Sequence, residues 1–259
     1  MSKLTIVLFL ISPFFACSDG GDFHADDIEV FKNTPVWSLA KAIHNGDNDE
    51  MNNLINNYPE WLNYKEPKFG ITLLFWTIYN SSFHSIGRGD YYEQAKVLVL
   101  NGANPYVTDN TGKTSISEAA NVHSESMKFI QLCIDSKHTN ELSGSLKRKL
   151  LSEALIVSSG KNQEEIESVL LLVKAGADIN YFNSDSTKTP VSESLIHDNM
   201  TLAKYFIVDK GANFDYNIKY MVDRSDWSVL KIIKELDYPK NSKKNKLKQD
   251  IFDFIDKNN

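Results

Sequence analysis

Histidine, cysteine and serine are the side chains of this sequence that could bind a metal or attack a substrate. No two of the six histidines are paired at a metal-ligand spacing: they are His24, His44, His84, His123, His138 and His197. Ser158, Ser159 and Gly160 lack the Gly-x-Ser-x-Gly frame of a nucleophile elbow, and no glycine-rich phosphate loop opens a helical pattern. We therefore expect no metal, no cofactor and no enzymatic activity.

Cys17 is the residue for which the sequence predicts covalent chemistry. Met1 to Lys3 and the apolar run Leu4 to Ile11 are typical of an export signal, because the run is too short to span a bilayer. The stretch from Ser12 to Cys17 resembles the lipobox of bacterial lipoproteins, in which a small residue precedes the cysteine that is acylated. This resemblance implies a signal peptide over residues 1–16 and a lipid on Cys17.

Two alternatives to lipidation stay open, namely a conventionally secreted chain and a retained apolar N-terminus. Phe14 disfavours an ordinary signal-peptidase cut after Ala16, since such a cut requires a small residue at that place. Residues 17–33 contain Gly20 and Gly21 and are interpreted as a lipidated tether. The expected location is the bacterial cell envelope, facing the periplasm and anchored in a membrane, with a soluble periplasmic protein as the alternative. Ser18 after the cysteine favours the outer over the inner membrane within this resemblance.

Composition and charge narrow the classes of partner. The chain has 259 residues, ordinary apolar and charged fractions and a net charge of −6. Nucleic acid is not the expected partner, because phosphate binding requires a basic face. Lys240 to Lys248 is the one basic run, and it is interpreted as a solvated linker. Cys17 and Cys133 are too few for a disulfide framework or a zinc quartet, and Cys133 is expected to be buried and inert.

One phrase occurs three times and indicates how the chain is organised. It is Asn101-Gly102-Ala103-Asn104, then Ala175-Gly176-Ala177-Asp178, then Lys210-Gly211-Ala212-Asn213, and each copy closes an apolar helical pattern. The last two glycines are 35 residues apart and the first two 74, which is two units of about 33 residues with a short insertion. Such a period predicts helical pairs that bury their apolar faces on their neighbours.

The repeated pattern resembles the ankyrin repeat. Thr189-Pro190-Val191 and Thr111 to Ile116, followed by Ala119-Ala120, are similar to the start of that family's first helix. The resemblance implies an all-α, ankyrin-like solenoid of about five to six units over residues 34–238, with a further divergent pair or half-pair from Ile218 to Leu236. Residues 239–259 are interpreted as a basic linker and a C-terminal capping helix. We expect a monomer.

The ankyrin resemblance also implies a protein-binding surface made by the first helices and by the loops between repeats. Carried over residue by residue, it places these residues on that surface: Trp76, Tyr106, Asp109, Glu118, Glu153, Tyr181, Asp185 and Glu193. Rings beside acids predict a protein partner that bears a basic patch. The alternative for Tyr106 and Tyr181 is that they only pack between adjacent loops.

The function expected from these features is a membrane-anchored module that binds another protein without catalysis. A sharper hypothesis is an immunity or inhibitor protein that blocks a toxin in the cell envelope. The alternative is an envelope scaffold or assembly factor for a resident periplasmic enzyme.

Overall fold

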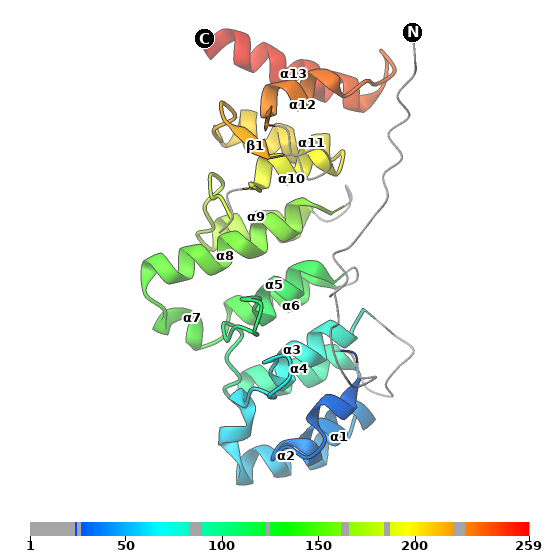
Figure 1. Ribbon diagram of the computed structural model, residues 1–259, viewed down its shortest axis with the longest axis vertical. Helices are drawn as coiled ribbons and strands as arrows, with labels where there is room; N and C mark the ends of the chain where they lie inside the picture. The colour runs from blue at the N-terminus through cyan, green and yellow to red at the C-terminus, as the bar shows by residue number, and fades with distance from the viewer. Residues whose placement is uncertain are drawn as a thin grey trace.

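The computed structural model describes residues 24, 27–82, 90–122, 125–161, 166–183, 187–219 and 226–258. These residues form six helical pairs stacked along one direction, with the first pair at one end and the C-terminal helix at the other (Figure 1). The pairs are α1 (Trp37–Asn45) with α2 (Asn48–Asn57), α3 (Leu73–Asn80) with α4 (Tyr91–Leu100), α5 (Ser115–Asn121) with α6 (Ser126–Ile134), α8 (Gly144–Ser159) with α9 (Ile166–Lys174), α10 (Pro190–Ile196) with α11 (Met200–Lys204), and α12 (Val229–Glu235) with α13 (Lys243–Asn258).

Shorter elements connect these pairs. Two 3-10 helices, η1 (Ile28–Phe31) and η2 (Pro59–Asn63), flank the first pair, and α7 (His138–Glu141) precedes α8. A π-helical turn, η3 (Tyr205–Asp209), continues α11. Two antiparallel strands, β1 (Asn217–Lys219) and β2 (Asp226–Ser228), lie before α12. No described helix has the length and apolar content needed to cross a membrane.

Three of the first helices, α3, α5 and α10, start at threonine side chains. Thr72, Thr114 and Thr189 each accept a hydrogen bond from the backbone N–H three residues later, which satisfies one of the free donors at a helix N-terminus. At Thr114 and Thr189 the serine in the third helical position bonds back to the cap, so that both helices begin with a capping box. Three first helices therefore start in the same register.

The glycines of the repeated phrase end the second helices. Gly102, Gly176 and Gly211 have φ of +110°, +106° and +66°, a region in which a Cβ is strained. The backbone N–H of the alanine that follows each glycine donates to a carbonyl of the preceding helix, for example Ala177 to Leu172 at 3.0 Å. The prediction that this phrase closes each unit is confirmed.

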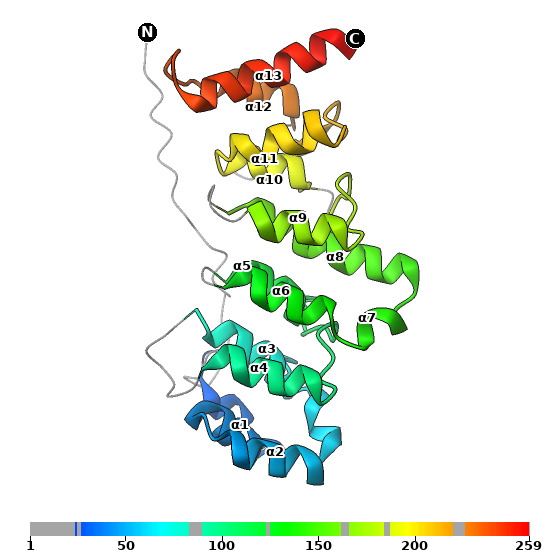
Figure 2. The same cartoon turned by 180° about the vertical axis from the view of Figure 1, so that it is seen from behind.

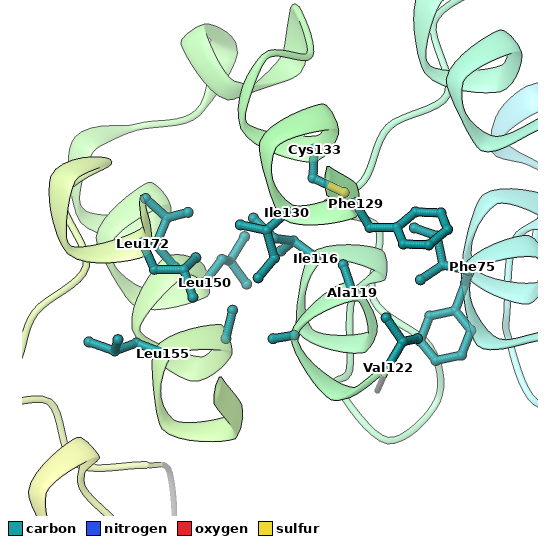
Figure 3. Close-up of a cluster of buried hydrophobic side chains, with 14 of the residues drawn as sticks. Phe75, Ile116, Ala119, Val122, Phe129, Ile130, Cys133, Leu150, Leu155 and Leu172 are labelled. Carbon is teal, nitrogen blue, oxygen red and sulfur yellow. The ribbon is translucent and has the colours of Figure 1, made fainter. Parts of the chain in front are cut away.

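The first helices α3, α5, α8 and α10 contact one another in that order, as do the second helices α4, α6 and α9. We call these sets the first-helix row and the second-helix row; Figure 2 shows the second row in front. Apolar side chains fill the space between successive pairs, as Phe75, Ile116, Phe129 and Leu172 do in Figure 3. Cys133 is fully buried in this core, and burial raises the pKa of its thiol, so it is an inert core residue as expected.

Two sequence predictions for the C-terminal part are right only in part. Residues 217–219 and 226–228 form the paired strands β1 and β2, and α12, which Ser228 caps, is the one helix described between Ile218 and Leu236, as in the half-pair alternative. The lysines of the basic run are also not all solvated. Lys244 pairs with Asp198, and Lys248 donates to the carbonyls of Lys234 and Leu236 at 3.1 and 2.6 Å. These carbonyls end α12 and would otherwise lack a partner.

The capping helix itself is confirmed. Ile251 and Ile255 of α13 are buried, and α13 packs on α11 and η3 of the preceding pair. Lys240, just before α13, and Lys243 and Lys246 near its start remain exposed. The helix therefore covers the open end of the stack with its apolar face, and exposed lysines lie near its start.

Candidate functional site

Trp76 is not on the surface, although the sequence predicted an exposed anchor. Its side chain has no exposed area, and its ring makes edge contacts with Phe31 at 5.9 Å and Tyr91 at 6.2 Å between centroids. Trp76 lies four residues after Thr72, the N-cap of α3. The three residues between them, Leu73 to Phe75, are also apolar and buried. The predicted register is right, but that position faces the preceding repeat.

Glu118 and Glu193 occupy the same register in their helices, four residues after Thr114 and Thr189, and they too are buried. The amide of Asn121 donates to Glu118 at 3.2 Å, and burial raises the pKa of the Glu118 carboxyl despite Lys113 and Lys161 nearby. A partner cannot reach these carboxylates directly, so their predicted role on an exposed surface is wrong.

Lys188 and His197 lie beside the second of these carboxylates. The Lys188 ammonium is 3.4 Å from Glu193 Oε2, and His197 Nδ1 is 3.9 Å from the same oxygen. A Cβ on Gly160, at the C-terminal end of α8, would lie only 3.3 Å from that oxygen and 3.2 Å from the His197 ring. The end of α8 therefore packs closely against these two side chains. The Glu193 carboxylate is thus paired inside the fold with the Lys188 ammonium, beside the His197 ring.

Glu153 and Tyr181 are the predicted site residues that the structure brings together at the surface. Both are half-buried, and the Tyr181 hydroxyl donates to Glu153 Oε1 at 2.8 Å. Burial, together with the bond to the carboxylate, raises the pKa of Tyr181 to about 12. The pair joins α8 to the loop that follows Ala177 and keeps ring and carboxylate in a fixed relation.

Tyr106 and Asp109 serve the loops themselves. Tyr106 is buried, and its hydroxyl shares a hydrogen bond with Thr139 Oγ1 of α7 at 2.7 Å, so its predicted role on an exposed surface is wrong. Asp109 Oδ1 accepts from Thr111 N, Thr111 Oγ1 and Lys113 N, each at 2.8 Å, so this oxygen organises a turn. Asp185 and Cys17 lie outside the described residues.

Sequence reasoning missed the asparagines that connect one loop to the next. Asn63 accepts from Asn104 N at 2.7 Å and donates to Gly102 O at 3.3 Å, which ties two successive repeats together. Asn180 accepts from Asn213 N at 2.7 Å in the same way. Each of these two is followed directly by a tyrosine, Tyr64 or Tyr181, and this recurring Asn-Tyr pair was the signal that could have revealed them.

The loops of the first-helix row form one edge of the stack, which we call the loop face: residues 64–70, 106–113 and 178–183 with 187–188. Lys65, Lys68 and Lys113 are exposed on it, while Tyr64, Phe69 and Phe182 are half-buried. Since two of the three first-helix glutamates are buried, this surface has mixed charge rather than the acidic character predicted. Among the described residues no cluster of three or more His, Cys, Asp or Glu could hold a metal ion.

No protein-family model and no curated protein matches the sequence. Solved structures do match. The chain is similar to the ankyrin repeat domain of Bcl-3, a member of the IkappaB protein family, with 20% identity and a TM-score of 0.55 over 76% of this chain and 83% of that one. It is also similar to the ankyrin repeat protein EF0377, with 16% identity and a TM-score of 0.57 over 86% of this chain and 98% of that one. The chain thus has an all-α, ankyrin-like solenoid fold.

Proposed function

We propose that this chain is a non-catalytic module that binds another protein through the loop face. The observation that carries the proposal is the connection of successive loops by Asn63, Asn110 and Asn180. Asn110, for example, donates its backbone N–H to Phe69 O at 2.9 Å and its amide to Lys68 O at 3.3 Å. Loops fixed before binding lose little conformational freedom on binding, which favours affinity.

The side chains on this face suit a protein partner. Half-exposed rings such as Tyr181 and Phe69 supply contact area at low entropic cost, and the Lys68 ammonium lies 5.1 Å from the centre of the Phe69 ring. Lysines at the loop tips and the carboxylate of Glu153 together favour a partner whose surface carries both signs of charge. The mechanism is steric, in that a rigid surface covers part of the partner.

The proposal includes a place for this module. The sequence from Leu4 to Cys17 supports export and acylation at Cys17, with residues 17–33 as a tether to the membrane and the envelope as location. A module held there by lipid and covering a partner's surface suits an immunity or inhibitor protein that neutralises a toxin in the envelope. A scaffold for a resident enzyme would use the same surface and would leave the enzyme active.

The binding proposal predicts that the combined Glu153→Lys and Tyr181→Ala change weakens partner binding by at least about 2 kcal/mol. The change removes the Tyr181 ring and reverses the charge at position 153. The partner is first captured from the cell envelope with the tagged protein, and its affinity is then measured by titration calorimetry. Lys96→Ala, on α4 away from the loop face, is the control and should cost less than about 0.5 kcal/mol. Unchanged affinity in a folded double variant removes the loop face from the proposal.

The anchoring proposal predicts that Cys17→Ser abolishes incorporation of radiolabelled palmitate and releases the protein from the membrane fraction. The reason is that the thiol of Cys17 is the acceptor of the first acyl group in the lipoprotein pattern that the leader resembles. Cys133→Ser is the matched control, because that thiol is buried and should take no label. Equal labelling of wild type and Cys17→Ser, or labelling of neither, contradicts acylation at Cys17.

A further inference from the structure

The second-helix row leaves large apolar side chains in water. Leu100 of α4 is 74% exposed, Met127 of α6 is 47% exposed and Leu170 of α9 is 41% exposed. They come from three successive second helices, which lie in order along the side of the stack shown in Figure 2. Scattered exposed apolar residues are ordinary, but apolar residues that gather around a concave feature indicate an interaction surface.

Met127 and Leu170 line such a feature. A groove of about 380 Å³ runs between α6 and α9, and Tyr92 and Leu171 complete its apolar lining. Leu100 is not part of it. None of the residues that line the groove belongs to the loop face, so a molecule bound in the groove leaves the loop-face residues free. Two adjacent helices with an apolar furrow between them offer the packing surface that a third helix needs, with side chains of one helix inserted between those of the others.

The charges at the groove are placed at its two ends. Lys128 is already engaged, since its ammonium pairs with Glu125 and lies 5.6 Å from the centre of the Tyr92 ring. Glu167 in the first turn of α9 and Lys174 in its last turn both line the groove and are exposed. Neither has an ion-pair partner among the residues that the structure describes. Seven residues of helix separate them, which is about 10 Å along the axis.

From this arrangement we infer that the groove between α6 and α9 binds an amphipathic helix of a partner protein, which runs antiparallel to α9. Its apolar stripe fills the groove over Met127 and Leu170, an acidic side chain in its first turn meets Lys174, and a basic side chain in its last turn meets Glu167. Acids near the N-terminus and bases near the C-terminus are also what a helix itself favours, because of its macrodipole. The antiparallel direction is therefore supported both by the end charges and by the opposed dipoles.

The length of the groove limits the contact. Helices α6 and α9 have nine residues each, which corresponds to about 13 Å and to two or three turns of a bound helix. Apolar residues spaced by three and four positions over that length supply the side chains that enter the furrow. This inference is independent of the loop face and would give the chain a second binding surface.

The experiment uses the full chain and two synthetic peptides of about 15 residues with the same leucine stripe and the same composition. The matched peptide has glutamates in its first turn and lysines in its last turn, and the swapped peptide has these charges exchanged. Fluorescence anisotropy gives the dissociation constants. We expect the matched peptide to bind at least about fivefold more tightly than the swapped one, and Met127→Glu or Leu170→Glu to weaken it at least about tenfold.

Two variants make the test specific. Leu100→Glu places the same charge on a more exposed leucine outside the groove, and it should leave the affinity for the matched peptide unchanged. The Glu167→Lys, Lys174→Glu double variant should reverse the preference and bind the swapped peptide more tightly. Tyr181→Ala on the loop face should have no effect on either peptide, so the failure of this inference is distinguishable from that of the proposed function.

Three outcomes overturn the inference. In the first, both peptides bind equally to the wild type and to the charge-reversed variant. In the second, Met127→Glu and Leu170→Glu stay folded by circular dichroism and retain full affinity. In the third, neither peptide binds, while the chain binds vesicles that contain phosphatidylglycerol and Leu170→Glu abolishes that binding. The last result would make the groove a contact with a lipid surface instead of a helix site.

Discussion

Trp76→Ala should lower the free energy of unfolding by about 3–5 kcal/mol, the range for an aromatic side chain deleted from a close-packed core. The ring is fully buried between η1 and α4, where it meets Phe31 and Tyr91 edge to face, and His44 lies 6.3 Å away between ring centroids. Removal leaves a cavity at the contact of the first two repeats. Because each repeat contacts only its neighbours, the loss should be concentrated in residues 28–100.

Urea denaturation followed by circular dichroism measures this loss, and hydrogen exchange locates it. Trp37→Ala is the matched control. Trp37 is half-buried, and its ring lies 5.4 Å from the Lys41 ammonium, so its removal should cost less than about 2 kcal/mol. Equal costs for the two changes would contradict the buried position of Trp76. If Trp76 were instead an exposed anchor, its replacement would weaken binding and leave the stability nearly unchanged.

Gly70→Ala should cost about 2–4 kcal/mol, which combines backbone strain with a steric clash. Gly70 has φ of +73°, and a Cβ there would lie 2.3 Å from Asn110 Oδ1 and 3.0 Å from Asn110 N. Asn110 would have to move away, although it donates to Phe69 O and to Lys68 O and so connects two loops. The change should therefore reduce both the stability and the order of the loop face.

The control for this change is Gly144→Ala. Gly144 is the first residue of α8, has no positive φ, and an added Cβ would meet nothing within 4 Å. This replacement should stabilise the protein by about 0.4–1 kcal/mol, because alanine restricts the unfolded chain and fits the helix. Thermal unfolding followed by circular dichroism compares the two variants. A similar melting temperature for both would show that the conformation of Gly70 does not matter.

The sequence was sufficient to predict the elements that depend on local signals. The glycines at positions 102, 176 and 211 end helices through their own backbone conformation, and Thr114 and Thr189 start helices through side chains that reach only three residues ahead. Both signals are complete within a few residues of sequence. Their spacing predicted a stack of helical pairs, the resemblance to the ankyrin repeat predicted the type of stack, and the similar solved structures confirm the fold.

Local signals of this kind could not predict whether a site side chain is exposed to solvent. Trp76 and Glu118 occupy the same register after their caps, as predicted, yet whether that position is exposed depends on how closely the neighbouring helical pair approaches. Such distances are set by packing between repeats. The C-terminal lysines show the same limit, since Lys244 and Lys248 find their partners 46 and 12 residues away. A basic run reveals the charges that it carries, but not the carboxylate or carbonyls that it meets.

The packing of α13 on α11 also affects when the C-terminal repeats can fold during synthesis. Asp198, between α10 and α11, accepts hydrogen bonds from Tyr238 and Lys244, which follow it by 40 and 46 residues. The apolar side of α11 therefore stays uncovered until α13, the second helix of the following pair, has left the ribosome. In that interval the nascent chain exposes buried residues of the finished fold such as Leu202 and Phe206, and transient apolar exposure of this kind favours aggregation.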